Sequence, residues 1–312
     1  MNIKCYYPKE PYKDQHRWCA NVIFEKLTKK LVTTYPSIKF ELIDSIGYSE
    51  KLGIHHPSNP GQKFGYHRMI LENSINKKYF VVNYYDSLQS IHSINNWDTE
   101  NLIEVFSSTG VHKDHIFYNN SNIDYTPSSY CLRQVTDEDY LLKSKTNTST
   151  NIDLTFRGEL YLFRKFLKND SRFKIINSYY NKLSEKDYLK ELQDNFISLS
   201  LNGIGEICHR DIESFGAFST VIRPELTVQF HNKLIPDYHY ISIPTDDIKS
   251  LNTFSYYTEL SNRLYSKYLE VKNDKEYLRY IALNARKWFI ENGTINKNVE
   301  ILIKLIDFQK LM

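Results

Sequence analysis

Several features are scarce in this sequence, and each scarcity excludes a class of protein. Glycine accounts for 10 of 312 residues, well under the roughly 7% of average proteins, which excludes collagen-like and other glycine-rich architectures. The four cysteines lie far apart without a C-x-x-C pair, so we expect free thiols in a reducing compartment. No apolar run approaches the ~20 residues that cross a bilayer, and the first ten residues lack a signal-peptide core. These absences predict a cytoplasmic protein without a membrane span, in a cell or in an infected host cell.

An excess of charge of one sign is also missing. The chain has 40 Lys+Arg and 37 Asp+Glu, which gives a formal charge of +3. Up to Thr150 there are 17 basic and 16 acidic residues, and beyond it 23 and 21. Nucleic-acid-binding proteins concentrate basic residues on one face, because neutralised phosphates supply most of the affinity. The near-neutral halves therefore argue against nucleic acid as a partner, whereas salt-dependent binding of a duplex would indicate it.

The residues that are present predict a folded protein of two domains. Hydrophobic residues make up 41% of the chain and aromatic residues 14%, and 312 residues exceed the usual size of one domain. Strand-like and helix-like stretches alternate, which implies an α/β protein with parallel sheets covered by helices. The polar, aperiodic stretch 143–151 is the predicted boundary, so we expect an N-terminal domain over 1–148 and a C-terminal domain over 149–312.

The second half shows the clearer alternation of strands and helices. The expected elements are a strand to Gly158, a helix over 159–167, a strand over 196–201, a helix over 209–215 and a strand over 217–222. In open α/β sheets, ligands bind outside the carboxyl ends of the strands. This rule selects the strand end at Thr155–Gly158, the turn at Asn202–Glu206 and the corner at Arg223–Glu225.

The turn and the helix after it suit a phosphorylated ligand. Gly203 and Gly205 allow the backbone to approach a ligand, and the amino end of a helix favours an anion. Arg210 and Glu213 are three residues apart and share one helix face. A guanidinium forks onto phosphate and a carboxylate accepts from ribose hydroxyls, so the pair suits a nucleoside diphosphate. The alternative is a surface ion pair beside an ordinary turn.

Four motifs in this order resemble a known family over roughly residues 150–292. They are Phe156-Arg-Gly158, followed by a helix with Arg164; the block Phe196-Ile-Ser-Leu-Ser-Leu-Asn-Gly-Ile-Gly-Glu-Ile-Cys-His-Arg-Asp-Ile-Glu213, followed by Gly216-Ala-Phe-Ser-Thr-Val-Ile222; Phe230-His-Asn-Lys-Leu-Ile-Pro-Asp-Tyr-His-Tyr-Ile241; and Ala282-Leu-Asn-Ala-Arg-Lys-Trp-Phe289. This order is similar to the nucleotide-sugar-binding half of GT-B glycosyltransferases of the exostosin and CAP10 (protein O-glucosyltransferase) kind. The resemblance implies two Rossmann-like domains with parallel sheets facing across a cleft. The N-terminal domain would bind the acceptor and the C-terminal domain the donor, with a final helix near 294–310 packing back on the N-terminal domain.

The resemblance also implies an activity and a set of donor-binding residues. A GT-B enzyme transfers a sugar from a nucleotide diphosphate sugar, here a UDP-sugar by family analogy, to a hydroxyl of a glycan, a protein or another acceptor. We expect an inverting reaction that requires no metal and no cofactor, because arginines and a helix dipole stabilise the leaving diphosphate. Arg157 and Arg210 would face the diphosphate, and Glu213 the ribose. The donor site is predicted to comprise Arg157, Gly158, Gly203, Gly205, His209, Arg210 and Glu213, of which Arg210 also assists catalysis; His209 stands where those families commonly have a small residue.

An inverting transfer needs a base that takes the proton from the acceptor hydroxyl. Asp86, which follows the strand-like run Tyr79–Tyr85, is the first candidate, and Asp44 is the second. Both aspartates also fit a turn or a helix N-cap. His55, His56 and His67 are candidates of third rank.

Three other interpretations remain open. One is an enzyme that acts on modified DNA bases, since some phage glycosyltransferases are GT-B; the near-neutral halves argue mildly against it, and salt-dependent binding of a duplex would support it. Asp137-Glu138-Asp139 is formally a D-x-D motif, which binds manganese in GT-A glycosyltransferases, although acidic residues before a helical run favour an N-capped helix. The protein could instead be a non-catalytic sugar- or nucleotide-binding module on the same fold, with tyrosines stacking on sugars or bases. Turnover of a nucleotide sugar distinguishes the enzyme from the binding module.

Overall fold

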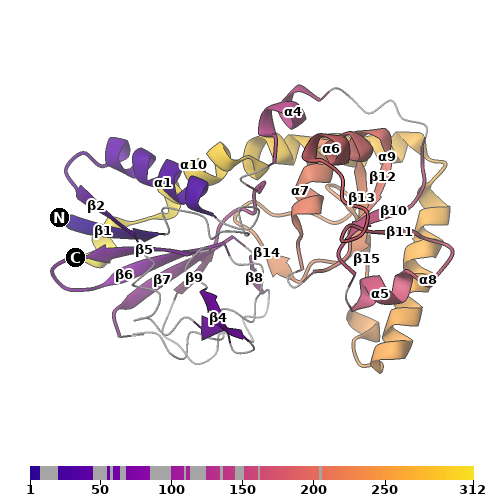
Figure 1. Ribbon diagram of the computed structural model, residues 1–312, viewed down its shortest axis with the longest axis horizontal. Coiled ribbons are helices and arrows are strands. Elements are labelled where there is room, and N and C mark those ends of the chain that lie inside the picture. Colours follow the sequence, from indigo (N-terminus) through magenta and orange to yellow (C-terminus); the bar gives the residue numbers. More distant parts are fainter. Residues whose placement is uncertain are drawn as a thin grey trace. The chain divides into compact units, whose positions relative to one another are not determined.

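The chain folds into two compact units. The computed structural model describes residues 1–7, 20–44, 55–56, 59–63, 68–84, 100–108, 110–112, 124–133, 136–144, 151–160, 162–203 and 206–312. Unit 1 comprises Met1–Val135, Val228–Asn232 and Asn292–Met312, and unit 2 comprises Thr136–Thr227 and Lys233–Glu291. The chain therefore first enters unit 2 upstream of the predicted boundary at 148, and its last residues belong to unit 1. Figure 1 follows both units along the chain.

Unit 1 is built on a six-stranded mixed sheet. Its strand order is β2 (Lys39–Asp44), β1 (Asn2–Tyr7), β5 (Arg68–Asn73), β6 (Tyr79–Asn83), β7 (Leu102–Ser107) and β9 (Asp124–Pro127). β1 runs parallel to β2, and β6, β7 and β9 run parallel to one another. β5 runs antiparallel to both of its neighbours, so unit 1 departs from a purely parallel sheet. The short pairs β3 (His55–His56) with β4 (Asn59–Lys63), and β8 (Val111–His112) with β14 (Val228–Gln229), are antiparallel.

Helices from the two ends of the sequence complete the core of unit 1. The helical spacing of Ile23, Phe24, Leu27 and Leu31 predicts a buried stripe, and in α1 (Asn21–Thr34) all four are buried. α1 packs against α10 (Ile295–Leu305), and both belong to one apolar cluster with β1, β5 and β6. The short helix η7 (Phe308–Leu311) adds Leu311 to this cluster. The C-terminal segment is thus part of the core of unit 1.

Unit 2 is built on a five-stranded sheet in which every strand runs parallel. Its order is β11 (Lys174–Asn177), β10 (Thr155–Gly158), β12 (Ile197–Leu199), β13 (Thr220–Pro224) and β15 (Ile241–Ile243). In chain order this is 2-1-3-4-5, the doubly wound arrangement in which the direction of winding reverses between the first and third strands. The switch point of unit 2 therefore lies between β10 and β12. The α/β class predicted for the chain, with Rossmann-like parallel strands, is confirmed.

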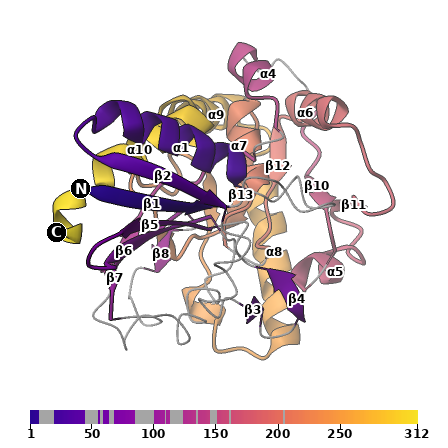
Figure 2. The ribbon, with the colours of Figure 1, turned by 60° about the vertical axis from the view of Figure 1, so that its left-hand side comes forward.

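Six α-helices accompany the sheet in the part of unit 2 that the structure describes. Their bounds are α4 (Glu138–Lys143), α5 (Phe163–Leu167), α6 (Glu185–Asp194), α7 (His209–Gly216), α8 (Thr253–Val271) and α9 (Lys275–Trp288). α5, α8 and α9 bury Leu167, Leu264 and Ile281 in one cluster with the strands, whereas α7 contacts α4, α6, α9 and β13 (Figure 2). The described residues also form a 3-10 turn, η5 (Asp246–Ile248), and a π-turn, η6 (Phe289–Gly293), which passes from unit 2 into unit 1 at Asn292.

Two boundaries in unit 2 differ from the sequence expectation for local backbone reasons. α5 begins at Phe163 rather than Glu159, because Leu162 has a φ of 48°, which is incompatible with a right-handed helix. β13 begins at Thr220 rather than Ala217, because Ala217 caps α7 and Phe218 has a φ of 59°. Among the described residues, no helix combines the length and the apolar character that a bilayer crossing requires.

Candidate functional site

The switch point of unit 2 brings together the segments that the sequence rule selected. β10 ends at Gly158, the segment after β12 contains Leu201 and Asn202, and α7 begins at His209 after its cap residue Cys208. Carboxyl ends of neighbouring parallel strands lie at one edge of a sheet, and the crevice at a switch point is where such sheets bind ligands. This edge of the sheet is therefore the candidate site of unit 2.

Arg210 stacks on a buried ring at the end of β10. Its guanidinium carbon lies 4.1 Å from the centroid of the Phe156 ring, and Phe156 is fully buried. A Cβ on Gly158 would lie 2.8 Å from Nη2 of Arg210 and 2.9 Å from the Phe156 ring. Only glycine therefore leaves room for this stack.

The guanidinium of Arg210 makes no hydrogen bond and no ion pair with a described residue. Its Nε is buried without a hydrogen bond, and no described carboxylate pairs with it. Taking a charged group out of water is costly unless an opposite charge or hydrogen bonds compensate. A half-buried arginine held this way is poised for an anionic ligand, and phosphate oxygens suit its fork of donors.

A second arginine shares the Phe156 ring. The guanidinium carbon of Arg164 lies 5.0 Å from the ring centroid. Arg164 is buried and donates from Nη2 to the carbonyl of Leu201 at 2.7 Å and to Sγ of Cys208 at 3.3 Å. Burial raises the pKa of the Cys208 thiol, an effect that Arg164 opposes. Arg164 thus adds a second positive charge beside Phe156 and ties the segment after β12 to the start of α7.

A buried ion pair fixes the first turn of α7. Nη1 of Arg223 lies 2.8 Å from Oδ1 of Asp211, and both side chains are at most 1% exposed. Oδ2 of Asp211 accepts from the Cys208 N–H at 2.7 Å, and Arg223 also donates to Oδ1 of Asn202 and to the Glu206 carbonyl. Burial by itself lowers the pKa of the Arg223 guanidinium, but the Asp211 carboxylate holds that pKa above its usual range. This pair anchors both the helix start and the segment that precedes it.

Two residues expected at the nucleotide are engaged within unit 2. Arg157 forms a two-pronged ion pair with Glu191, at 2.8 and 2.6 Å, and donates from Nη1 to the Asn181 carbonyl at 2.7 Å. Glu213 is 1% exposed, and its two oxygens accept from Thr136 Oγ1 and from the Tyr188 hydroxyl, each at 3.0 Å. The hydrogen-bonding groups of Arg157 and Glu213 are therefore occupied by contacts within unit 2, whereas the Arg210 guanidinium makes no such hydrogen bond with a described residue.

The remaining predicted residues are placed as follows. His209 is the first residue of α7 and is half-buried, as is Gly203 in the segment after β12. Gly205, Asp86 and His67 lie outside the described residues, and so do the side chains of His55 and His56 in β3. Asp44 is the exposed last residue of β2.

The D-x-D motif begins a helix. Asp137 is the N-cap of α4, and its carboxylate accepts from the Tyr140 N–H at 2.8 Å. Glu138 and Asp139 occupy the first turn, where negative side chains interact favourably with the helix dipole. The helix-start interpretation is confirmed, and the part of the chain that the structure describes holds no cluster of three or more His, Cys, Asp or Glu side chains arranged for a metal.

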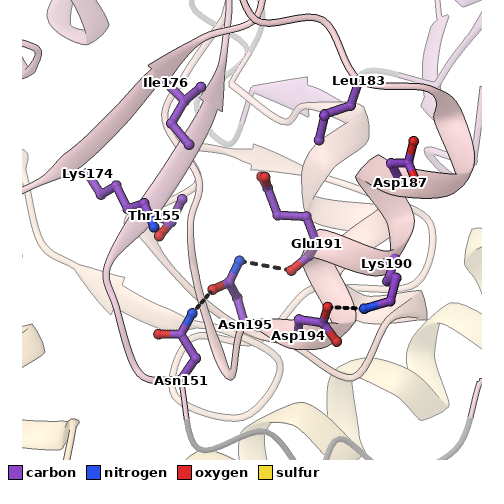
Figure 3. A pocket seen from close by; sticks show the side chains of 10 residues that line it. All are labelled: Asn151, Thr155, Lys174, Ile176, Leu183, Asp187, Lys190, Glu191, Asp194 and Asn195. Atoms are coloured by element: carbon purple, nitrogen blue, oxygen red, sulfur yellow. Dashed lines mark hydrogen bonds and ion pairs between the residues drawn. The ribbon is translucent and has the colours of Figure 1, made fainter.

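A separate groove of about 300 Å³ lies between α6 and the strands β10 and β11 (Figure 3). It is lined by Asn151, Thr155, Lys174, Ile176, Leu183, Asp187, Lys190, Glu191, Asp194 and Asn195. Thr155 and Lys174 are the first residues of their strands, so the groove extends to the amino ends of β10 and β11. Its charges are balanced by neighbours: Lys190 pairs with Asp194 at 2.5 Å, and Glu191 pairs with Arg157. The groove is therefore a less favourable binding site for an anion than the surroundings of Arg210.

Sequence reasoning selected the segments that contain Phe156 and Arg223 but gave neither residue a role, and it did not identify the ion pair of Arg223 with Asp211. An aromatic residue two positions before a strand-terminal glycine is the only local signal for Phe156. The ion pair joins residues twelve apart on different elements, and no sequence pattern marks it.

Comparison with known proteins gives likenesses of structure alone. No protein-family model and no curated protein matches the sequence. The chain is similar to an alpha-glucosyltransferase solved with UDP-glucose and DNA containing an abasic site, with 8% identity, coverage of 98% of this chain and 99% of that chain, and a TM-score of 0.46. It is also similar to a glycosyltransferase from Rickettsia africae, with 10% identity, coverage of 95% of this chain and 82% of that chain, and a TM-score of 0.42. A third likeness is to TarM, with 11% identity, coverage of 80% of this chain and 67% of that chain, and a TM-score of 0.38. At these identities and TM-scores the function has to be argued from the chain's own residues.

Proposed function

We propose that unit 2 binds the diphosphate of a nucleotide sugar at Arg210, and that the protein is a GT-B glycosyltransferase. The observation that carries this proposal is the Arg210 guanidinium, which is stacked on Phe156, has a buried Nε and makes no hydrogen bond and no ion pair with a described residue. It lies at the switch point of a doubly wound sheet and in the first turn of α7, where helix N–H groups also favour an anion.

The other residues of the site support Arg210 in different ways. Gly158 keeps open the space beside the guanidinium, and Arg164 adds positive charge next to the same ring. Gly203 and His209 are proposed to present their backbone to the phosphates, and Gly205 is added on the sequence argument alone. Arg157 and Glu213 are proposed to support the site indirectly, because their existing hydrogen bonds hold neighbouring segments in place. This division differs from the resemblance, which gave Arg157 and Glu213 to the nucleotide.

The chemistry we propose is transfer of the sugar to a hydroxyl of a glycan, a protein or another acceptor. Arg210 would stabilise the charge that develops on the leaving diphosphate, so that neither a metal nor a cofactor is required. Asp86 remains the proposed base of an inverting reaction, on the sequence argument alone. Unit 1 is proposed to bind the acceptor. UDP is the first nucleotide to test, because UDP-glucose is the donor bound in the alpha-glucosyltransferase structure named above.

The test is calorimetric and thermal-shift titration with UDP, GDP, CDP, ADP and dTDP, with Mn²⁺ and with EDTA. A ligand that binds only the folded protein raises its stability, so we expect one diphosphate to raise the melting temperature in EDTA. Arg210→Ala should weaken that binding on the order of 10–100-fold, because it removes charge-assisted hydrogen bonds. Arg279→Ala, which removes an exposed arginine of α9, is the matched control.

Each other result has a defined meaning. Wild-type affinity in Arg210→Ala would show that the phosphates bind elsewhere, and binding that requires Mn²⁺ would favour the GT-A interpretation with Asp137 and Asp139. Asp86→Asn should keep diphosphate binding and lose the release of UDP from a UDP-sugar. Affinity for the nucleotide sugar without any turnover in the wild type would favour the non-catalytic module.

A further inference from the structure

Two adjacent tyrosines project from unit 2 at the carboxyl edge of its sheet. Tyr179 and Tyr180 are each 77% exposed, and their ring centroids lie 5.0 Å apart at an interplanar angle of 87°. They belong to the turn that follows β11. Large aromatic side chains are common in cores and at binding surfaces, where their amphipathic rings supply contact area. Two of them side by side in water therefore need an explanation.

The backbone that presents the tyrosines is held firmly. The Ser178 N–H donates to the Gly158 carbonyl at 3.1 Å, and the Asn181 N–H donates to the Asn177 carbonyl at 3.0 Å. The Tyr179 N–H donates to the Asn177 side chain at 3.0 Å. Arg157 donates to the Asn181 carbonyl at 2.7 Å while it is ion-paired with α6. A surface that is ordered before binding loses little entropy when a ligand arrives.

The tyrosine pair lies at the same edge of the sheet as the candidate phosphate site. Ser178 is hydrogen-bonded to Gly158, and Gly158 is the residue whose missing Cβ makes room for Arg210. β10 and β11 run parallel and are paired up to Gly158 and Asn177. The turn therefore begins directly beside the strand end that carries the phosphate site.

We propose that Tyr179 and Tyr180 form a platform that binds a pyranose ring of a neutral oligosaccharide. Because the two rings are nearly perpendicular, a sugar whose C–H face stacks on one ring meets the edge of the other. Nucleic acid fits this surface less well, because the two lysines of this segment, Lys182 and Lys186, are balanced by two acidic residues, Glu185 and Asp187. The segment therefore has no excess of positive charge that would attract phosphates. Binding of the oligosaccharide to this platform does not depend on the proposed transferase function, which assigns the acceptor to unit 1.

The experiment is binding of maltohexaose, cellohexaose and N-acetylchitohexaose, measured by saturation-transfer-difference NMR and by calorimetry. The variant is Tyr179→Ala/Tyr180→Ala in the full chain. Tyr280→Ala is the matched control, since Tyr280 is an exposed tyrosine of α9. A single-stranded dT20 oligonucleotide, at low and at high salt, is the competing probe.

We expect at least one hexasaccharide to bind the wild type and Tyr280→Ala with equal affinity at both salt concentrations. The double variant should bind it on the order of tenfold more weakly, with unchanged affinity for the nucleoside diphosphate. The proposal is overturned if no hexasaccharide binds or if the double variant binds like the wild type. Binding of dT20 that weakens with salt and requires the two tyrosines would overturn the carbohydrate assignment. Arg210→Ala should lose diphosphate binding and keep hexasaccharide binding, which separates a failure of the phosphate site from a failure of the tyrosine platform.

Discussion

At the scale of single residues, the candidate site depends on the absence of a Cβ atom at Gly158. Arg210 and the Phe156 ring occupy the space that a Cβ on Gly158 would fill. The backbone of Gly158 does not adopt a positive φ, since Gly110 is the one glycine with positive φ among the described residues. The requirement for glycine here is therefore one of space and not of backbone conformation.

Gly158→Ala should displace the Arg210 guanidinium. We expect the affinity for the nucleoside diphosphate to fall about tenfold, because the donors no longer hold their direction toward the phosphates. Gly216→Ala is the control, since its Cβ would meet Leu141 and Phe289 at 3.0 and 3.1 Å and affect stability without reaching Arg210. Calorimetric titration combined with thermal denaturation separates the two effects. Unchanged affinity in Gly158→Ala would show that the stack is not part of the binding site.

At the scale of elements, a buried histidine fixes the turn before β15. His239 Nδ1 accepts from the Ile235 N–H at 2.9 Å, and the His239 N–H donates to the Ile235 carbonyl at 2.9 Å. Burial lowers the pKa of His239 to about 4. The imidazole is therefore neutral in the folded protein above about pH 4, which its role as an acceptor requires.

The stability of the folded protein should depend on pH through His239. Between about pH 4 and the ordinary histidine value of ~6.5, the unfolded chain binds a proton that the folded chain does not. The free energy of unfolding should therefore fall as the pH falls through this window. His239→Gln should reduce the fall by on the order of 1–3 kcal/mol, measured by urea denaturation at pH 7 and pH 4.5. His231→Gln, at an exposed histidine, should retain the wild-type slope; an equal slope in both variants would contradict the assignment.

Elements with local signals could be predicted from the sequence. The bounds of α6, Glu185–Asp194, follow from local signals, because Ser184 caps its first turn and the apolar residues follow at helical spacing. The start of α5 could not be predicted, since the positive φ of Leu162 has no sequence marker. The strand-end rule located the edge of the sheet that carries Arg210. It could not assign the partners of Arg157 and Glu213, because Glu191, Thr136 and Tyr188 are brought close only by the tertiary fold.

At the scale of the whole molecule, the division into units does not follow the order of the sequence. Unit 1 takes segments from the start, the middle and the end of the chain. Lys310 near the C-terminus donates to Oε2 of Glu104 at 2.7 Å, and Asn73 donates to the Leu311 carbonyl at 2.9 Å. Such contacts between distant segments decide which unit a residue belongs to, and hydrophobic periodicity does not encode them.

This division predicts that stability and donor binding can be changed separately. Leu302 in α10 is fully buried in the core of unit 1, so Leu302→Ala should lower the free energy of unfolding by about 2–5 kcal/mol, through lost burial and a cavity. The affinity for the nucleoside diphosphate should stay at the wild-type value, because every residue assigned to the phosphates belongs to unit 2. Leu283→Ala, at a leucine of α9 that is half exposed, should change the stability little. Chemical denaturation and calorimetry at a temperature where the variant is folded measure both quantities. A loss of diphosphate affinity in Leu302→Ala that matches the loss in Arg210→Ala would contradict the assignment of the phosphate site to unit 2.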